Sequence, residues 1–357
     1  MLIVVPSYKR TACLRWVLAS ICRCDVSNIA ERKQVVVVNN HPASREAVDH
    51  VIGEFADSSA IPCRALHRQE TIAAVDSWFS AIAEFAVESE AVFLLGDDDL
   101  MLPWGLRDRH REIVENDGDM LLSDFASRIY FFDGGRKYWM SGSLPAEADQ
   151  ERRACRWDFL PAEHPEASFM SNHCYRNTAS FRRGLELAFA WCDSQSWLAR
   201  GIRTAMLPFY LPYTITLVGG KVLSLRSKCV LRGAYAEEAM RSAYADGGNT
   251  AFYNLCAHDI FANRALPLYT ERLSRVCSAF RPAVIRGFLT MLFDRGIPLD
   301  VLARTFGHSG LKLTDLLSAD VLRGVPRVAI NLLGLRGARL RSMRRSIFLQ
   351  QTERLFQ

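Results

Sequence analysis

Residues 91–99 read Ala91-Val92-Phe93-Leu94-Leu95-Gly96-Asp97-Asp98-Asp99, and this stretch decides the fold. Five apolar residues in a row are typical of a buried strand, which Gly96 ends at once. The three adjacent carboxylates that follow repel one another, so such a cluster usually needs a counter-charge. Because ligands of open α/β sheets bind at the carboxyl ends of the strands, we expect the acidic cluster Asp97-Asp98-Asp99 to line a binding crevice.

Strand and helix patterns alternate on the N-terminal side of this stretch. Short apolar runs at residues 2–5, 35–38, 63–66 and 91–95 predict strands, and helical periodicity predicts helices at 11–22, 45–55 and 72–87. The alternation predicts an α/β fold with a mostly parallel sheet flanked by helices.

The remainder of the chain predicts two further parts. Residues 121–231 are mixed: Asp133-Gly134-Gly135 signals a hairpin, and 206–218 and 221–225 are expected to add strands around Gly219-Gly220. From about residue 236 helical patterns dominate. We therefore expect an α/β domain over 1–232 and a C-terminal α-helical domain over 233–357, with a boundary good to about ten residues.

The composition is that of an ordinary globular protein. Of the 357 residues, 49% are hydrophobic and 23% charged, and the net charge is +5. The ten cysteines are scattered, which favours reduced thiols. Without a recognisable secretory signal or membrane-spanning run, we expect a cytoplasmic protein.

The acidic cluster allows two interpretations. An aspartate run can be a solvated loop or a helix N-terminus favoured by the dipole. Its carboxylate oxygens are also the hard ligands that suit Mg²⁺ or Mn²⁺, ions that bind phosphate oxygens as well. The apolar strand before the cluster and Pro103 and Trp104 after it favour the metal site.

Three motifs in order resemble the family 2 glycosyltransferases with the GT-A (Rossmann-like) fold. The first strand runs into Pro6-Ser7-Tyr8-Lys9-Arg10, the second ends in Asn39-Asn40, and the acidic cluster is followed by Pro103 and Leu106. The resemblance covers residues 1–110 well and 165–230 loosely. It implies a metal-dependent inverting transferase that takes a sugar from a nucleotide-diphosphate sugar.

The resemblance also implies roles for individual residues. Donor binding falls to Pro6, Ser7 and Tyr8 at the nucleotide, Arg10 near the diphosphate, Asn39 at the nucleoside, and Asp97 and Asp98; the metal ligands would be Asp99 and Asp97. Two departures stand out. Asn39 is neutral where the family carries an acid, and Gly96 stands where many members carry a further Asp.

An inverting transfer needs a general base for the acceptor hydroxyl. In Trp191-Cys192-Asp193-Ser194-Gln195-Ser196-Trp197 the resemblance assigns that role to Asp193, at the start of a helix, where an Asp is equally a plain N-cap. Glu163 and Glu166 are the fallback bases. His173 and Arg176 are candidate contacts to the acceptor or diphosphate.

The expected acceptor is a glycan or a lipid-linked hydroxyl, in polysaccharide or glycolipid biosynthesis. Residues 323–345 hold seven arginines and no acid among apolar residues, a pattern of a peripheral membrane-surface helix or of a solvated basic face. We expect no nucleic-acid partner. The alternatives are a sugar nucleotidyltransferase, disfavoured by the absence of glycine from Pro6-Ser7-Tyr8-Lys9-Arg10, and a non-catalytic nucleotide-sugar-binding protein.

Overall fold

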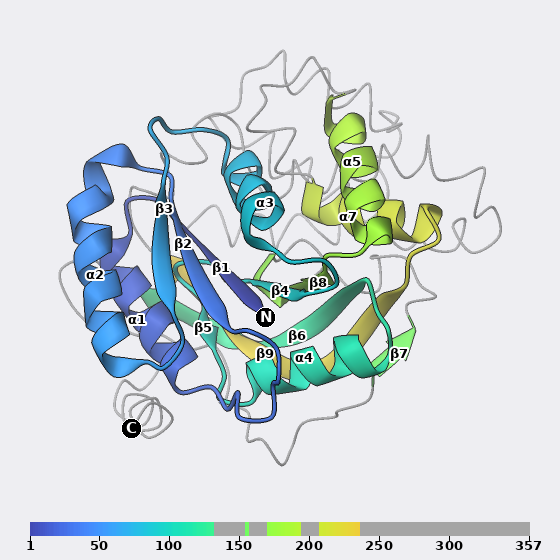
Figure 1. Cartoon of the computed structure of the whole chain (residues 1–357), viewed down its shortest axis with the longest axis horizontal. Coiled ribbons are helices and arrows are strands. Elements are labelled where there is room, and N and C mark those ends of the chain that lie inside the picture. Colours follow the sequence, from blue (N-terminus) through green and yellow to red (C-terminus); the bar gives the residue numbers. More distant parts are fainter. Residues whose placement is uncertain (132–153, 157–169, 194–206, 236–357) are drawn as a thin grey trace, which may run out of the picture. The chain divides into compact units, whose positions relative to one another are not determined.

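The computed structural model describes residues 1–131, 154–156, 170–193 and 207–235 (Figure 1). The chain divides into two compact units, and every described residue belongs to the first, which comprises Met1–Asp158, Glu166–Glu237 and Ser346–Gln357. The predicted hairpin turn, Glu163 and Glu166, the basic segment 323–345 and the predicted helical domain after residue 235 lie outside the described residues. Residue 232, the predicted boundary, falls inside a strand that continues to Tyr235.

The described residues form one nine-stranded sheet in the order β3-β2-β1-β4-β8-β6-β9-β5, with β7 paired to β9. The strands are β1 Leu2–Ser7, β2 Gln34–Asn39, β3 Cys63–His67, β4 Ala91–Leu94, β5 Leu100–Met101, β6 Met120–Phe131, β7 Ala154–Arg156, β8 His173–Arg176 and β9 Val222–Tyr235.

The sheet has two halves of different character. In the parallel half, β3, β2, β1 and β4 are all parallel, as the sequence predicted. In the mixed half, β8 lies antiparallel between β4 and β6, β9 is parallel to β6, and β5 is antiparallel to β9. The sheet is thus mixed rather than mostly parallel, because short antiparallel strands enter it beyond β4.

Helices cover both faces of the sheet (Figure 1). They are α1 Thr11–Cys22, α2 Arg45–Ser58, α3 Ala74–Phe85, α4 Gly105–Glu115, α5 Ala179–Asp193 and α7 Leu207–Leu217, with 3₁₀ turns η1 Pro42–Ser44 and η5 Met170–Asn172. The three helices predicted before β4 are confirmed, α1 with both ends as expected.

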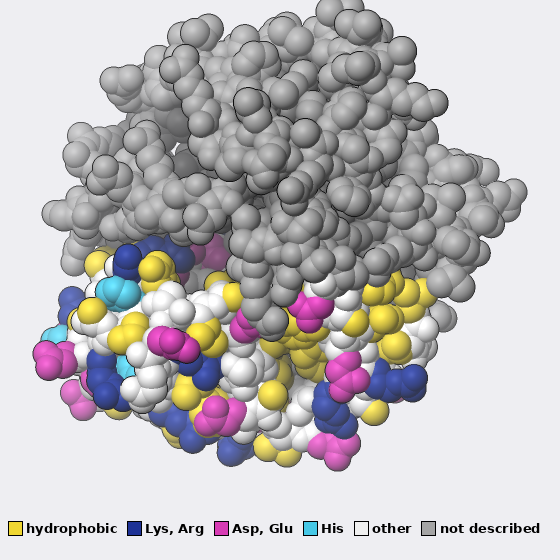
Figure 2. Space-filling model, turned by 90° about the horizontal axis from the view of Figure 1, so that it is seen from above, with side chains coloured by type: hydrophobic (Ala, Val, Ile, Leu, Met, Phe, Trp, Pro, Cys, Tyr) yellow, Lys and Arg dark blue, Asp and Glu magenta, His cyan; other side chains and the backbone are white. Residues whose placement is uncertain are grey.

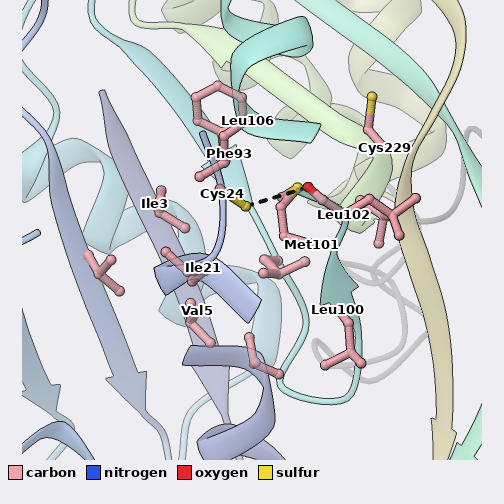
Figure 3. Close-up of a cluster of buried hydrophobic side chains, with 14 of the residues drawn as sticks. Ile3, Val5, Ile21, Cys24, Phe93, Leu100, Met101, Leu102, Leu106 and Cys229 are labelled. Atoms are coloured by element: carbon pink, nitrogen blue, oxygen red, sulfur yellow. Dashed lines mark hydrogen bonds between the residues drawn. The ribbon is translucent and has the colours of Figure 1, made fainter. Parts of the chain in front are cut away.

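Alternation along the strands separates the two faces. One buried cluster gathers Ile3 and Val5 of β1 with Phe93 of β4, Ile21 of α1 and Leu106 of α4 (Figure 3). In the same cluster the Cys24 thiol donates a hydrogen bond to the Leu102 carbonyl at 3.5 Å. Val4 of β1 is also buried but lies outside this cluster, and α3 contacts β1 and β2. The acidic cluster, which follows β4, therefore begins where the sheet ends, between the layers of side chains packed on its two faces.

The expected strand at 206–218 is wrong. Leu207–Leu217 form the helix α7, in which Leu207, Tyr210, Leu211 and Ile215 are all fully buried. A helix that is apolar on every side carries no helical periodicity, so its sequence resembles that of a buried strand. Close packing fixes α7 against α5, since a Cβ on Gly184 would lie 2.6 Å from the Ile215 side chain.

The described surface is of mixed charge. Figure 2 shows acidic and basic side chains interspersed over the described part of the face that it presents. None of the described helices combines the length and the apolar character needed to span a bilayer.

Candidate functional site

The carboxyl ends of β1, β2 and β4 bring the sequence motifs to one edge of the sheet. Ser7 is paired with Asn39, and Pro6 with Val38, across β1 and β2. The backbone N–H of Tyr8 donates a hydrogen bond of 3.1 Å to Asp97 Oδ2. Residues 6–10, Asn39 and the acidic cluster thus lie together, as their places after strand ends predicted.

Arg10 joins the acidic cluster to the beginning of α1. Its Nη2 lies 2.5 Å from Asp97 Oδ1, and its Nη1 donates a hydrogen bond of 2.7 Å to Asp98 Oδ2. Lys9, just before it, has a φ of 61°, a left-handed conformation rare for a side-chain-bearing residue. Such backbone strain is common at functional sites, and here it occurs between the Tyr8 N–H and the Arg10 guanidinium that both contact Asp97.

Asp99 faces the other way, into the mixed half of the sheet. Its Oδ1 accepts a hydrogen bond of 2.7 Å from the Gly233 N–H of β9, and its Oδ2 accepts one from the Ser171 hydroxyl of η5. The same hydroxyl accepts the Gly96 N–H at 2.8 Å. Both oxygens of Asp99 are therefore occupied by protein donors.

Gly96 is held in a close approach. A Cβ on Gly96 would lie 2.8 Å from Asp99 Oδ2 and 3.3 Å from both Asp98 Oδ1 and Ser171 Oγ. The absence of a further Asp at this position, noted in the sequence, is thus a requirement of the packing around Asp99.

A buried arginine, Arg109, holds the backbone at Ser171 in place. Arg109 of α4 is fully buried, and its guanidinium donates hydrogen bonds to the carbonyls of Ser171, at 3.1 Å, and of His173. It also lies 5.2 Å from the centre of the Phe93 ring. Burial lowers the pKa of Arg109. This cation fixes the backbone that carries the Ser171 hydroxyl to Asp99.

Burial dominates the electrostatics of the acidic cluster. It raises the pKa of Asp97 to about 7, against the opposing charge of Arg10. Burial, with the neighbouring charge of Asp98, also raises the pKa of Asp99 well above its ordinary value. Carboxylates in such surroundings favour a bound proton or a nearby cation.

Asn39 is enclosed by protein partners. Its Oδ1 accepts the His41 N–H at 3.1 Å, and its Nδ2 lies 3.1 Å from His67 Nδ1, while His67 Nε2 lies 2.8 Å from Asp49 Oδ1. Because the Asn39 Nδ2 donates, the facing His67 Nδ1 accepts, and Nε2 carries the proton toward Asp49. Nearby, the half-buried rings of Tyr8 and His41 meet edge-on, with their centres 5.5 Å apart.

The geometry favours Asp98 as a metal ligand. Asp99 accepts hydrogen bonds from Ser171 and Gly233, whereas the Asp98 side chain is 17% exposed and, among the described residues, is bonded by the Arg10 side chain alone. Asp97 Oδ1 is buried, accepts no hydrogen bond within the described part of the chain, and faces the Arg10 cation. A buried anionic oxygen that faces a cation, beside a half-buried carboxylate, offers the oxygen ligands that suit a hard cation. No ready-made group of three or more metal-binding side chains occurs among the described residues.

The remaining candidates are Arg176, His173 and Asp193. Arg176 pairs with Ala91 at the amino end of β4 and forms an ion pair with Asp117, so the structure does not bring it to the acidic cluster. His173 is fully buried, with Nδ1 2.7 Å from the Tyr175 hydroxyl. Asp193 is the exposed last residue of α5, and residues 194–206, where the expected helix would begin, lie outside the described part of the chain.

Sequence reasoning missed four residues that hold the site: Ser171, Gly233, Arg109 and His67. His67 had a signal, because it ends β3 directly opposite Asn39. Ser171 and Gly233 had none, since they reach Asp99 across 72 and 134 residues of chain. Arg109 resembles the other charged residues of α4 until its burial is known.

No family model and no curated protein sequence matches this chain. Several solved structures have a related chain path. The mannosyltransferase PcManGT from Pyrobaculum calidifontis, in complex with GDP-Man and Mn²⁺, is 12% identical, with a TM-score of 0.46 over 93% of this chain and 86% of that one. S. aureus TarS 1–349 in complex with UDP is 14% identical, with a TM-score of 0.44 over 86% and 87%.

Longer TarS is also similar, at 14% identity and a TM-score of 0.43, and the match to 86% of this chain spans about half (52%) of that protein. Because these TM-scores are below 0.5, the likenesses assign neither a ligand nor an activity to this chain.

Proposed function

We propose that this protein is a metal-dependent glycosyltransferase of family 2 that moves a sugar from a nucleotide-diphosphate sugar to a hydroxyl acceptor. One observation carries the proposal: Asp97 and Asp98 meet Arg10 and the Tyr8 N–H at the edge where β1, β2 and β4 end. A diphosphate donor needs a cation site beside a nucleoside pocket, and this edge offers carboxylates, a guanidinium and two aromatic rings within one loop cluster.

The residues of this edge divide the work of donor binding. Asp98, and Asp97 beside it, would hold Mg²⁺ or Mn²⁺. When bound, that metal supplies electrophilic stabilisation to the departing diphosphate. Arg10 is the cation nearest to the same diphosphate. Pro6, Ser7, Tyr8 and Asn39 form the walls of the nucleoside pocket, with Tyr8 and His41 as its aromatic surface.

Asp193 is the proposed general base. The helix that carries it, α5, begins after β8 at the amino edge of β4, and Phe189 near its end packs against Phe79 in the middle of α3. The helix therefore returns toward the carboxyl edge, where the donor would bind. Asp193 would take the proton of the acceptor hydroxyl; the oxygen would bond to the anomeric carbon as the carbon–oxygen bond to the diphosphate breaks, with inversion.

The proposed acceptor is a glycan or lipid-linked hydroxyl in polysaccharide or glycolipid biosynthesis. The basic segment 323–345 is the proposed contact with the cytoplasmic face of a membrane, where anionic lipids attract arginines.

Two substitutions test the proposal against a matched control. We expect Asp98→Asn to abolish the thermal stabilisation that UDP or GDP with Mn²⁺ gives the native protein. We expect Asp193→Asn to keep that stabilisation and to lose turnover of the matching nucleotide-sugar by about 100-fold or more. Asp57→Asn, on the exposed side of α2, should change neither.

Three results would contradict the proposal. If UDP or GDP with Mn²⁺ stabilised Asp98→Asn as much as the native protein, the proposed donor site would be wrong. Release of pyrophosphate from a nucleoside triphosphate and a sugar phosphate would identify a nucleotidyltransferase. Donor binding without turnover of any nucleotide-sugar, across a panel of glycan and lipid-linked acceptors, would identify a binding protein.

A further inference from the structure

Arg10 stands where a metal cation would be needed. Its two terminal nitrogens contact Asp97 Oδ1 at 2.5 Å and Asp98 Oδ2 at 2.7 Å, so one guanidinium spans both carboxylates. Asp97 Oδ1 is buried and accepts no hydrogen bond from the described residues. Within the described part of the chain, Arg10 brings the positive charge opposite that oxygen. A cation is therefore a structural requirement here before any ligand binds.

A metal ion and Arg10 cannot both hold these oxygens. A divalent cation bonded to Asp98 would take the space and the negative charge that Arg10 now uses, and two cations that close repel each other. Asp99 is a poorer substitute partner for Arg10, because each of its oxygens already accepts a hydrogen bond, from Ser171 or Gly233. The displaced guanidinium needs a new anion.

Arg10 is able to move. Its side chain is 25% exposed, and it precedes α1 rather than lying within it. A long, partly exposed side chain can turn its head group without disturbing the backbone. The nearest new anion in a loaded site is the diphosphate that arrives with the metal, and planar guanidinium groups bind phosphate oxygens well.

We infer that Arg10 is an exchangeable counter-cation: the metal displaces it from Asp98, and it then pairs with the donor diphosphate, so that metal and nucleoside diphosphate bind cooperatively. The inference rests on the proposed function and adds to it the coupling between metal binding and nucleoside-diphosphate binding. Without a diphosphate the metal must break the Arg10 ion pairs, and it binds weakly. With a diphosphate the released guanidinium regains a partner, and each ligand strengthens the other.

The test measures binding rather than activity. Mn²⁺ alone is titrated by electron paramagnetic resonance, and UDP and GDP are titrated by calorimetry with and without saturating Mn²⁺. The proteins are the native chain, Arg10→Gln and Arg10→Lys. The control is Arg15→Gln, which breaks a matched but exposed ion pair with Glu54 on α1 and α2. Thermal melts establish that each variant is folded.

We expect Arg10→Gln to bind Mn²⁺ alone more tightly than the native protein, on the order of tenfold. We expect the gain in nucleoside-diphosphate affinity that Mn²⁺ confers to shrink by a similar factor. Arg10→Lys, which keeps the charge but not the double contact, should fall between the two, and Arg15→Gln should match the native protein.

The contradicting results separate this inference from the proposed function. If Arg10→Gln or Arg10→Lys binds Mn²⁺ no more tightly than the native protein while Asp98→Asn loses it, the counter-cation inference is wrong and the donor site stands. If Asp98→Asn binds Mn²⁺ and nucleoside diphosphate as the native protein does, or if no variant binds Mn²⁺ even with nucleotide, the proposed site itself fails.

Discussion

In the parallel half of the sheet the acidic cluster forms ion pairs with a cation, whereas in the mixed half the described hydrogen bonds to it come from neutral donors. Arg10 holds Asp97 and Asp98, and the hydroxyl of Ser171 and the N–H of Gly233 hold Asp99. A charged partner can be exchanged for another cation, but a neutral donor only fixes position. The comparison teaches that three identical side chains in a row divide into two that can bind a ligand and one that anchors the loop.

The largest expected effect is on the free energy of unfolding, when the buried Arg109 beneath the mixed half of the sheet is replaced. Arg109→Met removes two charge-assisted hydrogen bonds to buried carbonyls, and we expect it to lower the free energy of unfolding by about 3 kcal/mol. Urea denaturation measures this. Arg111→Met, a partly exposed position on the same helix, should change it by less than about 0.5 kcal/mol. Similar midpoints for the two variants would show that Arg109 does not hold Ser171.

The next expected effect is a dependence of thermal stability on pH, which arises from Asp97 in the parallel half. Burial raises the pKa of Asp97 to about 7 in the folded protein, so ionised Asp97 opposes folding above that pH. This opposition fades as the pH falls through 7, because the folded state then binds the proton first. We expect metal-free Asp97→Asn to melt a few degrees above the native protein at pH 8, with the difference shrinking by pH 5.5. A difference that grows toward acid would reverse the assignment.

Ser171→Ala tests the hydrogen bonds that attach the acidic cluster to the mixed half of the sheet. The variant leaves the Gly96 N–H without its acceptor and Asp99 without one donor, and we expect it to cost about 1–2 kcal/mol of unfolding free energy. Donor affinity should fall with it, because the loop of Asp97 and Asp98 loses its anchor. Ser58→Ala, whose exposed hydroxyl bonds the carbonyls of Glu54 and Phe55 in its own helix, provides the control for a lost hydroxyl. Unchanged binding of nucleotide and Mn²⁺ by Ser171→Ala would mean that anchoring is irrelevant to the site.

The smallest effect is expected at the opposite edge. Arg176 pairs with Asp117, whose side chain is 88% exposed, so Arg176→Ala should cost about 0–1 kcal/mol and leave nucleotide and Mn²⁺ binding unchanged. Calorimetric titration and a thermal melt measure both quantities. A clear loss of nucleotide affinity would restore Arg176 as a diphosphate contact.

The two halves also differ in how far the sequence predicts them. In the parallel half each strand and helix carries its own period, so α1 was predicted to the residue and the polar ends of β1, β2 and β4 were expected together. In the mixed half, β8 follows a long excursion of the chain, α7 is apolar all round, and Gly233 reaches Asp99 from 134 residues away. Such contacts have no local pattern. The acidic cluster was therefore predicted, but the division of labour within it was not.

Gly96 makes the evolution of this loop depend on the order of mutations. Any side chain there would meet Asp99 and Ser171, which already share a hydrogen bond. A fourth acid at this position needs Asp99 Oδ2, the nearest atom at 2.8 Å, to move away from Ser171, yet losing the Ser171 hydroxyl first strips the Gly96 N–H of its acceptor. Each single step passes through a weakened intermediate, so the two positions are epistatic. Libraries meant to redesign this loop should vary Gly96 and Ser171 together rather than in turn.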